Sequence, residues 1–278
     1  MRLLIFGLGY TAQALAAALR AQGWHVVGTT RDGRAGTLRF DDAMGVAAEL
    51  AAATHILSSV PPADAIDPVL ASYGAALARK DAWLGYLSST GVYGDTGGAW
   101  VDESAPTGTG RRSARAGADR EWCALGARVF RLPGIYGPGR SPLDRVASGR
   151  AHRVAMAGQV FSRVHVEDIV HGVIAGFAAP AGAYNLADDH PASQNAVIAF
   201  AAHLLGRAPP PFVPLESLSP MARGFYDENR RIATGKARRV LGWRPLYPDY
   251  RAGLRALNAI TKPAATSADP AAASSDQT

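Results

Sequence analysis

Six residues near the start of the chain constrain its fold more than any others. The sequence Gly-Leu-Gly-Tyr-Thr-Ala, at Gly7 to Ala12, follows the apolar run Leu3 to Phe6 and opens an amphipathic stretch, Thr11 to Gln22. Glycines at such a junction permit a tight turn and the close approach of a ligand to the backbone. The segment therefore predicts a strand, a glycine turn and a helix. We prefer this to a secretory signal peptide, because the glycines interrupt the apolar run.

Apolar runs alternate with helical stretches along most of the remaining chain. Strands are predicted at residues 25–29, 55–60, 83–88, 128–132 and 183–186, and helices at 68–80, in the segment ending near 125, and at 167–178 and 196–205. The strands are continuously apolar, which is typical of strands buried on both faces. We therefore expect an α/β fold, a doubly wound parallel sheet of the Rossmann type.

Proline and glycine interrupt this pattern twice. The affected segments, 137–160 and 206–262, are predicted to form a small substrate-binding lobe, while 1–136 and 161–205 form the NAD(P)-binding Rossmann domain. The last residues, 263–278, are small and polar without periodicity and are predicted to be a disordered tail.

Composition excludes several classes of protein. The chain has 278 residues, is 48% apolar and contains a single cysteine, Cys123. One cysteine forms no intrachain disulfide and suits a reducing compartment, so we expect a soluble cytoplasmic protein without a metal site. The net charge of +6 comes from scattered arginines without interleaved aromatic residues. We therefore expect a small anionic ligand, and neither nucleic acid nor membrane as a partner.

The glycine motif has the context of a dinucleotide site. In such sites the first glycine makes the turn, the second lets the backbone approach the pyrophosphate, and a small third residue permits close packing of helix and strand. Gly7, Gly9 and Ala12 fit these three roles, and Tyr10 and Thr11 open the helix whose N-terminus favours negative charge. Ser58, Ser59, Val60 and Pro61 follow the third strand and are predicted to pass beside a ribose of the cofactor.

The end of the second strand bears on which dinucleotide binds. Thr30 is followed by Arg31, which suits the 2′-phosphate of NADP, whereas an acidic residue there would hold the ribose of NAD. Alternatively, Asp32 takes the ribose and Arg31 faces solvent. We predict NADP, with NAD as the alternative.

Several further segments carry a resemblance to a known family. They are YLSSTGVYGD at 86–95, RLPGIYGPGR at 131–140, SRVHVEDIV at 162–170, YNLADD at 184–189 and LGWRPLY at 241–247. With the glycine motif, they resemble the NAD-dependent epimerase/dehydratase family of the extended short-chain dehydrogenase/reductase superfamily, over about residues 1–260. The short glycine motif is closer to the atypical branch. The resemblance implies a Rossmann fold binding NAD(P), a C-terminal substrate lobe, substrates such as nucleotide sugars, and dimers formed through helices at the sheet edge.

The family's chemistry relies on a serine or threonine and a Tyr-x-x-x-Lys pair, in which the lysine lowers the tyrosine pKa. Ser89 matches the serine, and Thr90 beside it is a second candidate. The tyrosine and lysine positions, counted back from Glu121, hold Ser113 and Gly117. The pair is therefore missing.

Substitutes for the pair lie elsewhere in the motifs. Tyr93 and Tyr136 follow strand ends and are candidate acids, although tyrosines of these motifs usually only shape the site. Arg111, Arg112 and Arg115 are candidates for the positive charge, with a solvated helix face as the alternative.

Other residues of the motifs are candidates for binding. Arg140 and Arg163 are predicted to hold a phosphate or carboxylate of the substrate. His165 is expected to be a packed, hydrogen-bonded histidine, and Asn185 is expected to close a turn.

Two functions remain open. One is an atypical NAD(P)-dependent oxidoreductase or epimerase, acting on an anionic substrate such as a nucleotide sugar, either as a monomer or as a homodimer. The other is a non-catalytic NADP-binding redox sensor or scaffold.

Overall fold

A seven-stranded parallel sheet forms the centre of the computed structural model, which describes residues 1–34, 36–63, 66–110 and 113–261. Its order is β11-β7-β5-β4-β1-β2-β3, so the chain winds outward in two directions from β1 and β4. The strands are β1 (Arg2–Phe6), β2 (His25–Thr30), β3 (Leu38–Arg39), β4 (His55–Ser58), β5 (Trp83–Ser89), β7 (Arg128–Leu132) and β11 (Gly182–Asn185). The predicted doubly wound sheet is confirmed.

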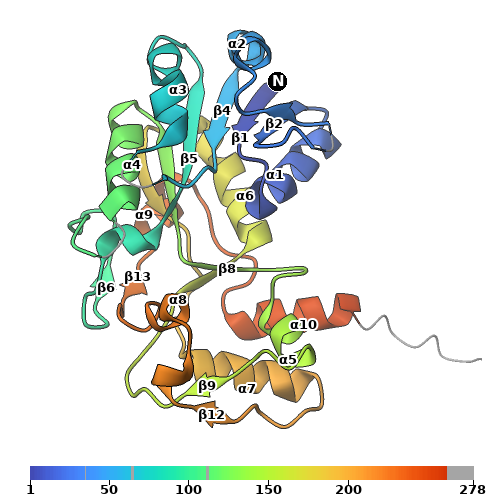
Figure 1. The fold of residues 1–278 in the computed structure, drawn as a ribbon, viewed down its shortest axis with the longest axis vertical. Coiled ribbons are helices and arrows are strands. Elements are labelled where there is room, and N and C mark those ends of the chain that lie inside the picture. The colour runs from blue at the N-terminus through green and yellow to red at the C-terminus, as the bar shows by residue number, and fades with distance from the viewer. Residues whose placement is uncertain (35, 64–65, 111–112, 262–278) are drawn as a thin grey trace, which may run out of the picture.

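Helices cover both faces of the sheet (Figure 1). α1 (Tyr10–Ala21) and α6 (Val166–Ala175) pack on one face, in a core that includes Leu3, Ile5 and Phe130. α2 (Ala43–Ala52), α3 (Pro68–Leu77) and α4 (Ser113–Ala124) pack on the other, around Leu4, Phe6 and Trp122. Burial on both faces explains why the strands are continuously apolar.

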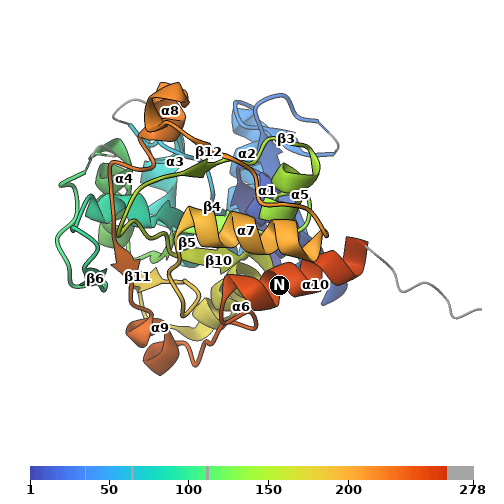
Figure 2. The same cartoon turned by 90° about the horizontal axis from the view of Figure 1, so that it is seen from below.

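A further layer lies beyond the carboxyl ends of the strands, at the bottom of Figure 1 and in front in Figure 2. It contains α5 (Pro142–Ala147), α7 (Gln194–Leu204) and α10 (Tyr250–Thr261), whose apolar side chains share one core. Three short parallel pairs extend this end of the molecule: β8 (Gly134–Tyr136) with β10 (Arg163–His165), β9 (Arg153–Val154) with β12 (Phe212–Val213), and β6 (Trp100–Val101) with β13 (Arg231–Ile232). α8 (Pro220–Arg223) and α9 (Gly235–Val240) complete the C-terminal region.

The packing of α7 bears on the predicted division into two units. Residues 196–205 were assigned to the Rossmann domain, yet Val197 and Ile198 of α7 pack with Leu143 of α5 and Leu254 of α10. Both partner helices come from segments predicted for the small lobe. The contacts of α7 therefore place this helix beside the predicted lobe. The boundaries between the two predicted units remain a prediction. The predicted tail at 263–278 lies outside the described residues.

Two predicted helix boundaries are confirmed by their local geometry. The Asp67 carboxylate accepts hydrogen bonds from the backbone N–H groups of Val69 at 2.9 Å and Leu70 at 3.0 Å, and Pro68 occupies the first turn. Gly23 follows α1 with a φ of +81°, which favours glycine. Within the described ranges, no helix is long and apolar enough to cross a membrane.

Candidate functional site

The two glycines of the first turn differ in what the fold requires of them. Gly7 has a φ of +81°, and a Cβ added to it would lie 2.8 Å from Val60 Cγ2. Gly9 has an ordinary φ of −86°, is exposed, and has no heavy atom within 4 Å of an added Cβ. The fold therefore needs glycine at 7 but not at 9. What glycine at 9 provides is a bare backbone open to a ligand.

Hydrogen bonds hold this turn against the neighbouring strand ends. The Leu8 N–H donates to the Thr29 carbonyl at 2.9 Å, and the Gly7 N–H donates to Thr29 Oγ1 at 3.2 Å. The Ser59 hydroxyl donates to the Gly7 carbonyl from the other side. The turn thus joins β1, β2 and β4 where the strand order reverses, which is where open α/β sheets bind ligands.

The N-terminus of α1 presents positive charge at the same place. Its N-cap residue, Gly9, makes no side-chain capping bond, and the first turn contains no acidic residue. Unpaired N–H groups and the helix dipole favour an anion there. Ala12 is fully buried in the core between α1 and the sheet, so a small residue at this position allows close packing. The backbone of Tyr10 and Thr11 belongs to this first turn.

The end of β2 offers an arginine for a second anionic group. The Arg31 side chain is exposed and makes no hydrogen bond or ion pair with the described part of the chain. Asp32 faces Arg34 instead, with 3.6 Å between Oδ2 and Nη1. The Thr30 hydroxyl shares a 2.7 Å hydrogen bond with Thr37. Among the described residues, Arg31 therefore has no partner, whereas Asp32 faces Arg34.

Ser89 and Thr90 lie at the end of β5, on the same edge of the sheet. Ser89 is half-buried, and its hydroxyl oxygen accepts a hydrogen bond from the Gly91 N–H at 3.1 Å. This bond orients the oxygen, and no described acceptor takes the hydroxyl hydrogen. Thr90 is 4% exposed and less accessible than Ser89. Ser58 is buried below the Ser59 to Pro61 segment, and its hydroxyl accepts from the Val60 N–H at 3.4 Å.

Tyr93 is a poor candidate for the proton donor. Its hydroxyl is buried, donates to Asn185 Oδ1 at 2.8 Å and accepts from Arg131 at 2.9 Å. Burial raises the pKa of Tyr93 to about 12, despite the nearby Arg131. Tyr93 thus has a structural position, and Asn185, expected to close a turn, is its partner.

Tyr136 lies in the core of the lower layer. Its hydroxyl is buried beside α10, where a Cβ added to Gly253 would lie 2.1 Å from it. Its ring meets the His165 ring edge-on at 5.1 Å. Burial raises the pKa of Tyr136, so this residue too is removed from the candidate acids. His165 is packed as expected, and its Nδ1 accepts from the Glu167 N–H at 3.3 Å.

Eight of the nine tyrosines are poor replacements for the tyrosine of the missing pair. All nine tyrosines lie among the described residues, and burial raises the pKa of eight of them: Tyr10, Tyr73, Tyr86, Tyr93, Tyr136, Tyr184, Tyr226 and Tyr247. A tyrosine acid near neutral pH needs the opposite shift. Lys80 and Lys236 bond to the carbonyls of Ala51 and Ala183, away from the carboxyl edge of the sheet.

The positions of the missing pair lie on α4. Ser113 is exposed, and a Cβ at Gly117 would meet nothing within 4 Å. Arg115, a candidate source of positive charge, donates to the Tyr86 hydroxyl at 3.2 Å. Arg111 and Arg112 lie outside the described residues.

Sequence reasoning missed a buried ion pair behind the site. Arg131, in β7, donates from Nε at 3.1 Å and from Nη2 at 2.7 Å to the Asp119 carboxylate of α4. Asp119 also accepts from the Ser88 hydroxyl at 2.6 Å. The network ties β5, β7 and α4 together directly beside Ser89. An aspartate on the inner face of a helix and an arginine in an apolar strand were its only signals.

Arg163 does not fit the predicted substrate role. It is 7% exposed, and its guanidinium donates to the carbonyls of Phe161 and Ala192 and to Gln194 Oε1, all within 3.0 Å. Burial lowers the pKa of Arg163 to about 10. Because its donors are engaged inside the protein, we remove it from the candidate site. Arg140, in contrast, is exposed beside Tyr10, with its Cζ 5.6 Å from the ring centroid.

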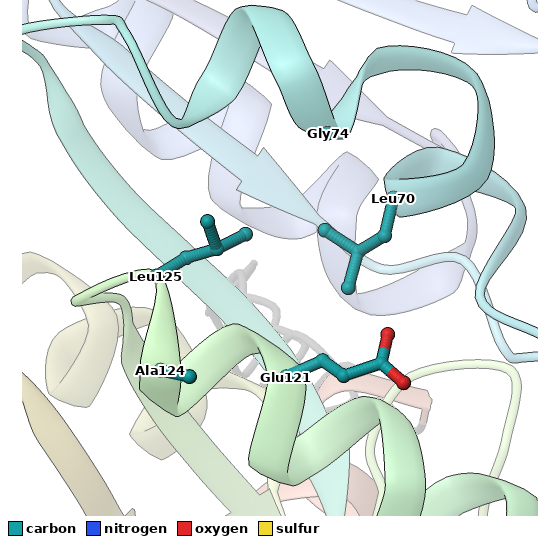
Figure 3. Close-up of a pocket in the computed structure, with 5 residues that line it drawn as sticks. All are labelled: Leu70, Gly74, Glu121, Ala124 and Leu125. Atoms are coloured by element: carbon teal, nitrogen blue, oxygen red, sulfur yellow. The ribbon is translucent and has the colours of Figure 1, made fainter.

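A hollow elsewhere on the molecule is unconnected with this edge. It lies between α3 and α4 and is lined by Leu70, Gly74, Glu121, Ala124 and Leu125 (Figure 3). None of these residues belongs to the glycine turn or to the strand ends, so we leave the hollow out of the candidate site.

Known proteins share both the sequence pattern and the fold. No protein-family model matches the chain. Protein YeeZ of Escherichia coli K12 is 31% identical over 275 residues, which cover 88% of this chain and 96% of YeeZ. A 3-diazoavenalumate denitrifying reductase of a Streptomyces species is 31% identical over 142 residues, 47% of this chain and 46% of that protein.

Solved structures extend the likeness to the whole fold. A functionally unknown conserved protein from Silicibacter pomeroyi is 43% identical with a TM-score of 0.82, covering 93% of this chain and 98% of its own. The human epimerase family protein SDR39U1, solved with NADPH, is 18% identical with a TM-score of 0.72, covering 93% and 99%. Thermus thermophilus UDP-glucose 4-epimerase, solved with NAD, is 20% identical with a TM-score of 0.74, covering 95% and 100%.

The doubly wound sheet and the glycine turn define a Rossmann-fold protein, and solved epimerase structures share this fold. Within that class, the chain belongs to the family of Protein YeeZ.

Proposed function

We propose that this chain is an NADP-dependent oxidoreductase of atypical design, acting on a small anionic molecule. The observation that carries the proposal is Gly9, an exposed glycine that the fold does not require, beside the uncapped N-terminus of α1. A dinucleotide is the ligand whose pyrophosphate uses both features. The fold neighbours solved with NADPH or NAD support the same assignment.

The residues of the site divide the binding task among them. The backbone of Gly7 to Ala12 would hold the pyrophosphate, Thr30 and Arg31 the 2′-phosphate end, and the Ser58 to Pro61 segment a ribose. When bound, the nicotinamide supplies the hydride chemistry. Ser89 would donate a hydrogen bond from its hydroxyl to the oxygen of the reacting group, because its own oxygen is already oriented by the Gly91 N–H. The proton that completes reduction of a carbonyl would come from solvent water.

The choice of an oxidoreductase over an epimerase rests on the similarity of 47% of the chain to a reductase. The missing tyrosine does not decide between the two reactions, because reduction of a carbonyl and epimerisation both need a proton donor or acceptor beside the nicotinamide. The anionic substrate class is supported by the net charge of +6 and by MoeE5, a fold neighbour solved with UDP-glucuronic acid and NAD.

A fluorescence titration with NADPH and with NADH tests the cofactor, and Arg31→Ala tests its 2′-phosphate contact. We expect a preference for NADPH that disappears in the variant. With a panel of anionic carbonyl compounds, Ser89→Ala should abolish NADPH oxidation while cofactor affinity stays within twofold. Equal turnover in Ser89→Ala would contradict the role of Ser89.

A second candidate is a non-catalytic NADP-binding redox sensor, favoured by Ser113 and Gly117 in place of the pair. A sensor requires clearly different affinities for NADPH and NADP⁺, because a ligand shifts an equilibrium only by its differential affinity. Equal affinities together with substrate-dependent oxidation of NADPH would exclude it.

A further inference from the structure

The loop between β8 and α5 lies directly against the first residue of α1. The Tyr10 hydroxyl donates to the Pro138 carbonyl at 3.1 Å, joining segments 128 positions apart. A Cβ added to Gly137 would lie 2.6 Å from the same hydroxyl, so the glycine permits this approach. The loop is therefore part of the wall around the glycine turn.

The backbone of this loop is fixed on both sides of Arg140. Gly137 and Arg140 exchange two backbone hydrogen bonds, of 3.2 and 3.0 Å, around Gly139 with its φ of +68°. The next residue, Ser141, forms a reciprocal capping box with Asp144 at the start of α5. Arg140 is thus placed by a closed turn and a capped helix rather than by a free loop.

The charge of Arg140 is not neutralised by the described part of the protein. No carboxylate there lies within 4.0 Å of its guanidinium, which faces the Tyr10 ring at 5.6 Å. The Asp144 carboxylate accepts instead from the backbone and the hydroxyl of Ser141, at 2.8 and 2.9 Å. Arg140 therefore lies beside the side chain of the first residue of α1, whose N-terminus also favours an anion, and an anion that reached both would be stabilised by both.

We infer that Arg140 binds the pyrophosphate of the dinucleotide, and that its predicted role as a substrate ligand should be replaced by this one. The inference rests on the proposed function, because it takes the dinucleotide as the ligand of the glycine turn. Arginine suits the task, since its planar guanidinium pairs with two phosphate oxygens at once. Tyr10 is a positioning residue that holds the loop and stacks beside the guanidinium.

Isothermal titration calorimetry with three probes distinguishes protein contacts to the pyrophosphate from contacts to the 2′-phosphate. NADPH carries both the pyrophosphate and the 2′-phosphate, ADP carries only the pyrophosphate, and adenosine 2′-monophosphate carries only the 2′-phosphate. We expect Arg140→Ala to weaken NADPH and ADP about tenfold or more, and to leave adenosine 2′-monophosphate within twofold. Arg31→Ala should do the reverse, weakening adenosine 2′-monophosphate while sparing ADP.

Two further variants keep the test independent of folding. Arg140→Lys retains the charge without the planar pair of donors and should recover part of the ADP affinity. Arg145→Ala removes an exposed arginine from α5 five residues away and should leave all three affinities unchanged.

The outcomes distinguish the inference from the proposed function. Wild-type protein that binds NADPH while Arg140→Ala keeps full ADP affinity overturns the inference alone. Wild-type protein that binds neither NADPH nor ADP overturns the proposed function, and the inference with it.

Discussion

The Arg131 guanidinium donates a 2.9 Å hydrogen bond to the Tyr93 hydroxyl, and both side chains are buried. Tyr93→Phe would therefore leave Arg131 Nη1 and Asn185 Oδ1 without a partner. We expect the free energy of unfolding to fall by about 1–3 kcal/mol, with little change in NADPH affinity. Denaturant unfolding and cofactor titration measure the two effects. Loss of turnover at unchanged stability would instead make Tyr93 a proton donor.

Asp119 compensates the buried charge of Arg131, at a distance of 2.7 Å. Asp119→Asn should destabilise the protein by about 3–5 kcal/mol, because it leaves a buried charge unpaired. Glu121→Gln, two residues further along α4 at an exposed position, is the control and should change stability by less than about 0.5 kcal/mol. Equal effects of the two substitutions in urea unfolding would contradict the pairing.

The buried carboxyl group of Asp188 should make the free energy of unfolding depend on pH. Its carboxyl group is 2% exposed, and burial raises its pKa to about 8, against about 3.9 in an unfolded chain. The folded state therefore binds the proton more tightly. The stability that Asp188 contributes is fully present below the unfolded pKa and is lost as pH rises through about 8.

Asp188→Asn tests this prediction, because the amide does not titrate. Between pH 5 and 8, the wild type should lose stability relative to the variant. The variant is the reference because other buried groups also titrate in this range. Burial lowers the pKa values of His55 and His165, so these two residues destabilise the protein as pH falls, in wild type and variant alike. A constant difference between wild type and variant across this range would show that Asp188 is not protonated in the fold.

Sequence patterns predicted the elements that are long or chemically marked. The strand, glycine turn and helix at the start and the beginning of the helix at residue 68 follow from local physics. The helix at Ala43–Ala52 was missed, although Asp42 caps it by accepting from the Gly45 N–H at 3.0 Å. Alanines and glycine give that stretch little helical periodicity, and its burial is decided by the sheet.

The sequence predicted the type of site that the protein has, but not which contacts its residues make. Motif context identified Gly7, Gly9 and Ser89, because glycine turns and strand ends are local features. Arg140 and Arg163 were alike in sequence, yet one is exposed beside Tyr10 and the other donates to three internal acceptors. Only the pairing of β8 with β10 and the approach of the Pro138 loop to α1 separate them, and both are long-range contacts.

The central claim is tested most directly at Gly9. The chain has room for a methyl group there and an ordinary φ, so Gly9→Ala should melt within a few degrees of the wild-type temperature, because the entropic gain of alanine opposes the loss of a good N-cap residue. If a dinucleotide approaches the bare backbone, the same substitution should weaken NADPH binding about tenfold or more in a fluorescence titration. Unchanged NADPH affinity in Gly9→Ala would contradict the account.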